Sequence, residues 1–238
     1  MTAVEKRELI AEGKAKKIYA TSDPDRLIFY FKDDATAFNA KKKGTIESKG
    51  ILNNRISQRF FGLLASHGIP SHFIAELGER EMLVRKLEII PCETVVRNRV
   101  TGSLRKRLGR VDGEVLAHPI VEFYYKSDEL DDPMINDDHA LVFGWATAAE
   151  LAEIRRQALA ANTVLKQFMS DRDVILVDFK LEFGRTPDGT VLLADEICPD
   201  TCRFWDAKTH EKLDKDRFRQ DLGNVEGAYQ EIMRRVAT

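Results

Sequence analysis

The sequence predicts an α+β fold of two lobes: a mostly antiparallel, β-rich lobe over residues 1–88 and a larger α+β lobe over residues 89–238. Two observations predict it. Short apolar runs separated by turn residues dominate the first part of the chain, as in antiparallel sheets. After a break at Pro91, runs with helical periodicity occur beside strand-like runs. The 238 residues, 43% hydrophobic and 32% charged, suffice for such a core and exclude a disordered or fibrous class.

The first strands carry a pair of lysines. Residues 5–20 and 27–31 predict a strand, turn, strand beginning, and Lys14 and Lys16, on either side of Ala15, point to one face. The two ammonium groups fit either phosphate binding or the protection of a solvated edge strand. The phosphate-loop motif G-x-x-x-x-G-K-[ST] does not occur in the sequence.

The rest of the first lobe predicts a loop, a helix and two strands. The polar residues 38–50 predict a loop with solvated lysines, and an apolar stripe over residues 51–64 predicts a helix. Residues 73–77 and 81–90 predict strands. The apolar part of the second strand fits either an adenine pocket or an ordinary central strand.

Residues 95–109 combine a predicted strand with a basic helix. Arg97 lies in the strand, and Ser103 lies in the Gly-Ser turn that opens the helix. Free backbone N–H groups at a helix start, together with a guanidinium that can grip phosphate through two hydrogen bonds, favour an anion site. A solvated basic surface is the alternative.

The following residues predict a strand over 120–125 and then an acidic loop with capping residues. Thr147 and Glu150 match a capping box, and apolar periodicity extends a long helix from it to Phe168. Two final helices are predicted over residues 214–222 and 225–236.

The most informative stretch is an acidic hairpin over residues 174–206. Alternation of apolar and polar residues places Asp178, Lys180 and Glu182 on one strand face. A Pro-Asp-Gly turn signal precedes the returning strand. If the loop has an even number of residues, Asp195 lies opposite Glu182; an odd loop without a bulge breaks this pairing.

The expected pairing of Glu182 and Asp195 suggests a metal site, because two facing carboxylates repel unless a cation lies between them. Oxygen ligands without neighbouring His or Cys ligands favour Mg²⁺, which leaves positions for water and substrate phosphates. A solvated polar strand face is the alternative. Lys180, and Asp200 and Arg203 in the Pro-containing loop that follows, favour a functional site.

Charge and cysteine content exclude several classes. The 37 Lys and Arg residues balance 39 Asp and Glu residues, so nothing indicates a general affinity for nucleic acid or anionic membranes. The N-terminus lacks the apolar core of a signal peptide and no run is long enough to span a bilayer, so we expect a cytoplasmic enzyme. Cys92, Cys198 and Cys202 predict buried, reduced thiols rather than a disulfide or zinc framework.

Five motifs carry a family resemblance, and they occur in this order: GKAKKIY (13–19), ETVVRNRVTGSL (93–104), VDFKLEFG (177–184), ADEICPDTCRFWD (194–206) and DKDRFRQ (214–220). Together they resemble the SAICAR synthetase (phosphoribosylaminoimidazole-succinocarboxamide synthase) family over nearly the whole chain. Cys198 and Cys202 stand where many members have Ser or Gly, and Arg85 where Lys is common. Neither departure changes the expected reaction.

The resemblance implies an ATP-dependent ligase that joins L-aspartate to the carboxylate of carboxyaminoimidazole ribonucleotide (CAIR), with ATP in a cleft between kinase-like or ATP-grasp-like lobes. It implies ATP contacts at Lys14, Ala15, Lys16, Val84, Arg85 and Leu87. It implies Mg²⁺ ligands at Glu182 and Asp195, and reacting-centre groups at Lys180, Asp178 and Asp200. It implies ribonucleotide contacts at Arg97, Ser103, Arg203 and Arg219. The expected partners are small molecules, with no nucleic acid and no membrane; a homodimer stays open.

The expected chemistry agrees with these residue types. A carboxylate is a poor electrophile, and phosphorylation by ATP converts it to an acyl phosphate that an amine can attack. Mg²⁺ and Lys180 neutralise charge on the transferred phosphoryl group, and Asp178 orients a reacting group or accepts a proton from the amine. Two alternatives remain: a kinase of a small phosphorylated metabolite, and a non-catalytic nucleotide-binding regulator. RNA binding through residues 97–110 is disfavoured because that segment lacks aromatic residues.

Overall fold

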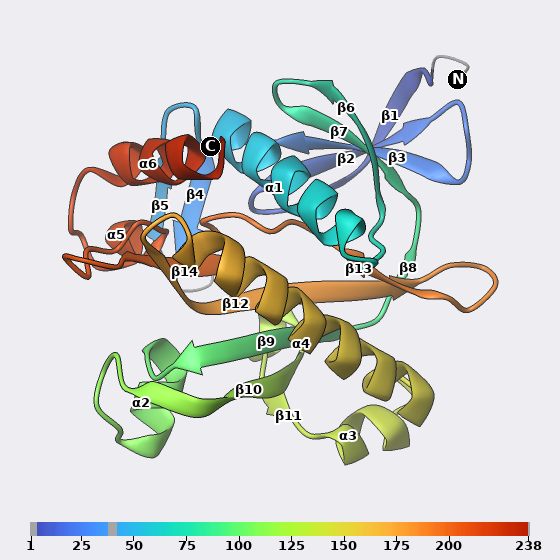
Figure 1. Ribbon diagram of the computed structural model, residues 1–238. Helices are drawn as coiled ribbons and strands as arrows, with labels where there is room; N and C mark the ends of the chain where they lie inside the picture. Colours follow the sequence, from blue (N-terminus) through green and yellow to red (C-terminus); the bar gives the residue numbers. More distant parts are fainter. Residues whose placement is uncertain (1–3, 38–41, 238) are drawn as a thin grey trace.

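The computed structural model describes residues 4–37 and 42–237, which form two large antiparallel sheets, a two-stranded sheet and the helices packed on them. The first sheet has the strand order β1-β2-β3-β7-β6 (Figure 1). Its strands are β1 (Lys6–Glu12), β2 (Lys16–Thr21), β3 (Arg26–Phe31), β6 (Phe73–Gly78) and β7 (Glu81–Arg85). Every pair of neighbours in it is antiparallel, which confirms the predicted N-terminal sheet.

The larger sheet is organised around one long strand, β12 (Val174–Arg185). The other strands are β8 (Glu88–Ile89), β9 (Cys92–Arg99), β10 (Val115–Tyr125), β11 (Met134–Ile135), β13 (Val191–Ala194) and β14 (Cys202–Asp206). One edge of β12 pairs with β14 and then β13, and the other pairs with β9 and then β8. The charged residues in the middle of β12 therefore lie where four strands meet.

The helices cover the two sheets and lie against one another. They are α1 (Lys49–Ser66), α2 (Gly102–Leu108), α3 (Asp137–Val142), α4 (Ala148–Ser170), α5 (Asp216–Arg219) and α6 (Val225–Ala237), with a 3-10 turn at Asp128–Leu130. Helix α1 packs on β3, β6 and β7 and also contacts α4 and α6, whereas α4 packs on β9, β10, β12 and β13 (Figure 1). The predicted packing of the long helix beside the hairpin is confirmed.

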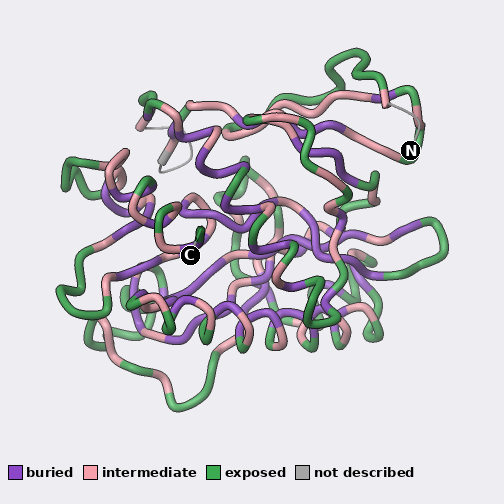
Figure 2. Tube along the Cα trace, turned by 45° about the horizontal axis from the view of Figure 1, so that its top comes forward, coloured by how far each residue is buried: buried purple, intermediate pink, exposed green. Residues whose placement is uncertain are grey.

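One apolar core runs through both parts of the chain. It joins Phe31 and Phe60 from the first part with Phe179, Leu165 and Ile232 from the second. Figure 2 shows the buried segments concentrated along the central strands and on the inward faces of the helices. Because this core crosses the expected boundary at residue 88, the division into two lobes stays a prediction. None of the helices in the described residues is long and apolar enough to cross a membrane.

Local signals were confirmed where they were strong. The capping box forms: Thr147 N donates to Glu150 Oε2 at 2.7 Å, and Glu150 N donates to Thr147 Oγ1 at 3.2 Å. The long helix extends from this cap to Ser170.

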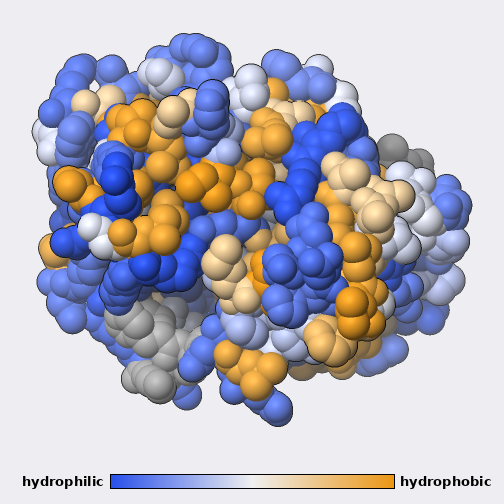
Figure 3. Space-filling model, turned by 90° about the horizontal axis from the view of Figure 1, so that it is seen from below, coloured by the Kyte–Doolittle hydropathy of each residue, from blue (hydrophilic) through white to orange (hydrophobic). Residues whose placement is uncertain are grey.

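The face of the molecule seen from below mixes apolar with hydrophilic groups (Figure 3).

Three predictions of local structure were wrong in part. The segment expected to be a loop over residues 38–50 contains β5 (Lys42–Thr45), which pairs with β4 (Asp34–Ala37), and the first two residues of α1. Residues 38–41 lie outside the described residues. The expected acidic loop contains β11 and α3, and the first of the two final helices shortens to α5. Strand β5 forms by pairing with its neighbour β4, and α3 begins at the N-cap Asn136, whose side chain accepts from His139 N at 3.1 Å.

Candidate active site

The acidic hairpin forms, but the predicted register was wrong by one residue. Glu182 pairs with Ala194, not with Asp195, because the strands are joined by an odd-numbered loop over residues 186–190. Thr190 N donates to Thr186 Oγ1 at 3.0 Å and closes this loop. Asp195 follows the last residue of β13 and has a φ of 62°, in the left-handed region.

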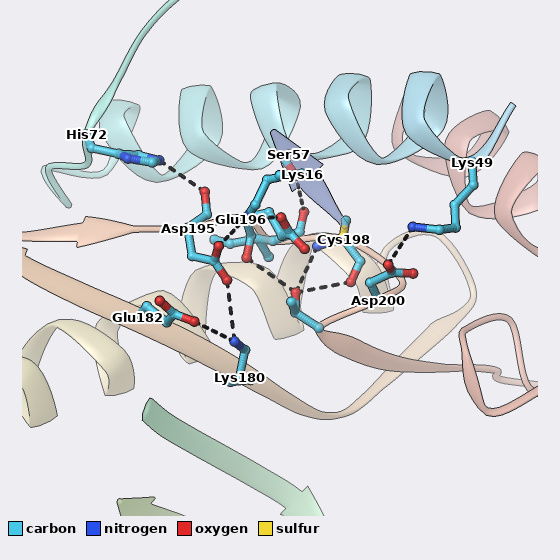
Figure 4. Close-up of polar contacts among 12 residues, drawn as sticks. Lys16, Lys49, Ser57, His72, Lys180, Glu182, Asp195, Glu196, Cys198 and Asp200 are labelled. Atoms are coloured by element: carbon cyan, nitrogen blue, oxygen red, sulfur yellow. Dashed lines mark hydrogen bonds and ion pairs between the residues drawn. The ribbon is translucent and has the colours of Figure 1, made fainter. Parts of the chain in front are cut away.

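A buried histidine supports this unusual backbone. Nε2 of His72 donates to the Asp195 carbonyl oxygen at 3.0 Å (Figure 4). Its ring packs edge-on against Phe29 and Phe61. Burial, together with nearby Lys16, lowers the pKa of His72 to about 4, so the ring is neutral at physiological pH.

Lys180 gathers three carboxylates around one ammonium group. Its Nζ lies 2.7 Å from Glu182 Oε1, 3.0 Å from Glu93 Oε1 and 3.4 Å from Asp195 Oδ2. Burial alone would lower the pKa of Lys180, but the three acids outweigh it and raise that pKa well above its usual value. Glu182 and Asp195 therefore meet at Lys180, although they are not cross-strand partners (Figure 4).

Lys16 links the first sheet to the end of the hairpin. Its ammonium group forms ion pairs with Asp195 and Glu196 (Figure 4). Burial would raise the pKa of Asp195, but Lys16 and Lys180 outweigh it and hold that pKa well below its usual range. Burial does raise the pKa of Glu196. The two predicted lysines bind different acids, because Lys14 is more exposed than Lys16 and forms an ion pair with Asp128 at 2.7 Å.

These charges line a cavity of about 520 Å³, here called the acidic cavity. Lys14, Ala15 and Lys16 form part of its wall, and its apolar side chains are Ile18, Phe29 and Ile89. Counted over the described residues, six acidic and four basic side chains line it. The other expected ATP contacts, Val84, Arg85 and Leu87, do not line it; Val84 is fully buried in β7.

A second cavity of about 320 Å³, the central cavity, adjoins the acidic cavity. The two share Ala15, Glu93, Asp132, Lys180 and Glu196 in their walls. Over the described residues, five acidic and five basic side chains line the central cavity. It is therefore close to neutral, unlike the cavities on either side of it.

Asp178 lies at the centre of an ion-pair network in the wall of the central cavity. Its carboxylate accepts from Arg97 Nη1 at 2.8 Å and from Arg203 Nη1 at 2.9 Å. Arg97 also donates to Glu122 at 2.7 Å and to Ser103 Oγ at 2.9 Å. Arg97 is thus a buried residue with most of its donors engaged, and Asp178 is placed to orient two guanidinium groups.

The third cavity, of about 660 Å³, is strongly basic and is here called the basic cavity. Over the described residues, six basic and two acidic side chains line it, and it shares Arg203 and Arg219 with the central cavity. Asp216 accepts from Arg203 Nε at 2.9 Å and from Arg219 Nη1 at 2.6 Å. Ser103 does not line the basic cavity, but its neighbour Gly102 does.

Asp200 also lies in the wall of the central cavity, and other side chains hold both of its oxygens. Oδ2 accepts from Lys49 Nζ at 2.7 Å, and Oδ1 accepts from the Tyr229 hydroxyl at 2.6 Å. Lys215 Nζ lies 3.6 Å from Oδ2. Burial would raise the pKa of Asp200, but Lys215 and Lys49 outweigh it and keep that pKa well below its usual range.

Sequence reasoning missed several residues of this site: Glu93, Lys126, Glu196, Lys215 and Lys49. Three of them lie inside the motifs already quoted, but alternation in a strand gives no reason to select them. Lys126 contacts Glu182 at 2.5 Å and had no local signal.

Comparison with known proteins agrees with this arrangement of motifs and cavities. The sequence profile of the SAICAR synthetase family matches residues 9–236. The phosphoribosylaminoimidazole-succinocarboxamide synthase of Brevibacillus brevis is 57% identical over 98% of each chain. The crystal structure of the synthase of that name from Ehrlichia chaffeensis superimposes with a TM-score of 0.95, at 48% identity over 97% of this chain and 98% of that chain.

A further solved structure is described as a SAICAR synthetase in complex with ADP. It superimposes with a TM-score of 0.93, at 53% identity over 96% of this chain and 97% of that chain. Similarity of this extent, along nearly the full length of both chains, shows common ancestry and a common fold. The chain belongs to the SAICAR synthetase family.

Proposed function

We propose that this protein is the ATP-dependent ligase of purine biosynthesis that joins L-aspartate to the carboxylate of CAIR, giving SAICAR, ADP and phosphate. The observation that carries the proposal is the sorting of charge along three adjoining cavities. An acidic cavity, a nearly neutral one and a basic one follow one another, with Lys180 in the wall of the first two and Arg203 in the wall of the last two.

The acidic cavity suits a nucleotide polyphosphate only together with a cation, because six acids and four lysines line it. Glu182 and Asp195 fit Mg²⁺, which needs only one or two carboxylates beside phosphate and water oxygens. In the described residues no group of three or more His, Cys, Asp or Glu side chains is arranged as a metal site, so an all-protein cage is not available there. When bound, Mg²⁺ neutralises phosphate charge.

The nucleotide site is supported by the ADP complex of the relative and by the wall of the acidic cavity. Lys14, Ala15 and Lys16 are the proposed contacts of the phosphates. Val84, Arg85 and Leu87 stay predicted contacts of the adenine, through the backbone at the end of β7 and of the residues that follow it.

The basic cavity suits a phosphate monoester without a metal, because six basic side chains face two acidic ones. Arg203 and Arg219 are the proposed phosphate contacts, since both lie in its wall. Arg97 and Ser103 support this end of the site, because Arg97 donates hydrogen bonds both to Ser103 and to Asp178.

The ribonucleotide carboxylate then lies in the central cavity, between the two phosphate sites. Its oxygen attacks the γ-phosphorus of ATP, and ADP leaves; the amine of L-aspartate attacks the acyl phosphate, loses a proton and displaces phosphate. Lys180 is placed to neutralise the oxygens of the transferred group. Asp178 and Asp200 complete the wall, the former by orienting Arg97 and Arg203.

An ADP-release assay with CAIR, with and without L-aspartate, tests the proposal. We expect stoichiometric SAICAR and ADP only when ATP, CAIR and L-aspartate are all present. Sustained ADP release without L-aspartate would point to the kinase alternative, and no release under any condition would point to a nucleotide-binding regulator. We further propose that the enzyme is cytoplasmic and acts on small molecules.

A further inference from the structure

We infer that Lys49 and Tyr229 are positioning residues that hold the Asp200 carboxylate in the wall of the central cavity and thereby set the affinity for the ribonucleotide. The inference rests on the proposed function. Lys49 is the first residue of α1, Tyr229 lies in α6, and Asp200 lies between β13 and β14. Three segments that are far apart in the chain therefore meet at one carboxylate.

The contacts to Asp200 divide between its two oxygens. Lys49 Nζ lies 2.7 Å from Oδ2 (Figure 4). The Tyr229 hydroxyl donates to Oδ1 at 2.6 Å. A carboxylate accepts about four hydrogen bonds, so each oxygen keeps acceptor capacity for a ligand. Because Asp200 lines the central cavity, that capacity is available to a molecule bound there.

The burial of these groups is costly and needs a reason. The Lys49 side chain is 0% exposed and that of Asp200 is 4% exposed. Removing an ammonium and a carboxylate from water is expensive, and an apolar pair of similar size is often as stable or more stable. A buried ion pair at the edge of a binding cavity is therefore better explained by the carboxylate that it presents than by stability.

Tyr229 and Lys49 make different contributions. An ammonium group is a compact point charge that attracts a carboxylate without fixing its rotation. A hydroxyl donor forms a directional bond to one chosen oxygen. Lys215 and Lys49 thus keep Asp200 ionised, and Tyr229 fixes the rotation of its carboxyl plane.

The loop that carries Asp200 is anchored separately along its length. Ser57 Oγ donates to the Ile197 carbonyl oxygen at 3.2 Å, and His72 donates to that of Asp195. Helix α1 and the residues after it thus hold the backbone of this loop (Figure 4), while Lys49 and Tyr229 act on the side chain at its end. The backbone is expected to keep its course when the Tyr229 hydroxyl alone is removed.

The first test is Tyr229→Phe, which removes one hydroxyl group and no ring. We expect the KM for CAIR to rise about tenfold, because one charge-assisted hydrogen bond is lost. The KM for ATP is expected to stay within about a factor of two of the wild-type value. Tyr125→Phe is the matched control: Tyr125 stacks on Trp145 and lines none of the three cavities. The inference would be overturned if Tyr229→Phe raised the KM for CAIR and the KM for ATP equally, or if Tyr125→Phe raised the KM for CAIR as much as Tyr229→Phe does.

The second test is a double-mutant cycle with Asp200→Asn, which separates positioning from a general structural role. If Tyr229 acts through Asp200, Tyr229→Phe has little further effect on the KM for CAIR in the Asp200→Asn background. If the two substitutions raise the KM for CAIR by factors that multiply in the double variant, Tyr229 does not act through Asp200. Lys49→Met completes the set, with ADP binding by calorimetry as the check that this variant is folded.

Failure of the inference and failure of the proposed function are distinguishable. If the wild-type protein makes no SAICAR from the three substrates, the function is wrong. If the wild-type protein is active and Tyr229→Phe has an unchanged KM for CAIR, the function stands and the positioning role is wrong.

Discussion

Gly102 and Arg203 approach so closely that a Cβ atom built on Gly102 would lie 2.8 Å from Nη2 of Arg203. Gly102 also has a φ of 54°, in the left-handed region that favours glycine. The start of α2 can therefore pass the guanidinium group only because this residue has no side chain. The backbone beside the proposed phosphate site therefore requires glycine at position 102.

We expect Gly102→Ala to displace Arg203 and to raise the KM for CAIR at least about tenfold, the loss of one charged hydrogen bond, with the KM for ATP unchanged. Gly144→Ala is the matched control, since Gly144 has a φ of 69°, a Cβ atom added there would meet no neighbour within 4 Å, and it lines none of the three cavities. Both variants carry the backbone strain of a positive φ, roughly 1–2 kcal/mol, so both lose some thermal stability. A normal KM for CAIR in Gly102→Ala would contradict the assigned role of Arg203.

The proposed metal ligands predict a change in Mg²⁺ dependence. Asp195→Asn and Glu182→Gln are each expected to lower kcat about a hundredfold or more and to raise the Mg²⁺ concentration that gives half-maximal activity. Activity measured across a Mg²⁺ titration at fixed ATP checks this. Asp128→Asn is the control, because Asp128 is an exposed acid in the wall of the same cavity. An unchanged Mg²⁺ requirement in Asp195→Asn would remove it from the ligand set.

The three cysteines are expected to be unreactive in the native protein. Cys92 and Cys198 are 0% exposed and Cys202 is 2% exposed. Burial raises the pKa of Cys92 to about 11 and raises that of the other two thiols as well, so the reactive thiolate is scarce. A thiol titration with an aromatic disulfide at pH 8 should find no rapidly reacting group in the native protein and three after unfolding. A fast native reaction would contradict the buried positions.

The C-terminal helix α6 predicts a small pH-dependent contribution to stability from Glu231. Hydrogen bonds from Arg234 and Arg235 lower the pKa of Glu231 to about 2 from 4.5. A lowered carboxyl pKa stabilises the fold above pH 4.5, and this contribution is lost as the pH falls towards 2. At pH 7 we expect Glu231→Gln to be less stable by about 0.5–1 kcal/mol, as for a partly exposed ion pair. Urea unfolding of both proteins at pH 7 and pH 3 should show the difference shrinking; a constant difference would contradict the linkage.

The sequence predicted the elements whose signals are local. Alternation over residues 174–185 and the capping box at Thr147 were sufficient to place β12 and α4, because side-chain period and helix capping depend on neighbours in the chain. The first sheet was predicted for the same reason. Over residues 42–45 the local pattern is polar, and pairing with the neighbouring strand β4 decided the structure.

The hairpin shows the limit of this reasoning. A Pro-Asp-Gly signal locates the turn but does not determine whether the loop length is odd or even, and one residue of difference changes every cross-strand pair. The loop proved odd, so Glu182 faces Ala194. Asp195 still approaches Lys180, because the left-handed backbone at Asp195 and the hydrogen bond from His72 direct it there.

Lys49 shows the limit for charged residues. It lies in a basic segment that predicts solvated lysines, yet it is fully buried against Asp200, 151 residues away in the chain. Glu93, Lys126 and Glu196 likewise acquire their roles from partners on other strands.

By itself the sequence determined the types of charged residue, the strand faces that carry them and the family that their motifs resemble. Only the tertiary structure decided which of these charges meet, and so divided them into an acidic, a neutral and a basic cavity. The physical reason is that residue type and local periodicity are properties of short segments. The net charge that lines a cavity is instead the sum over side chains that the fold brings together from distant parts of the chain.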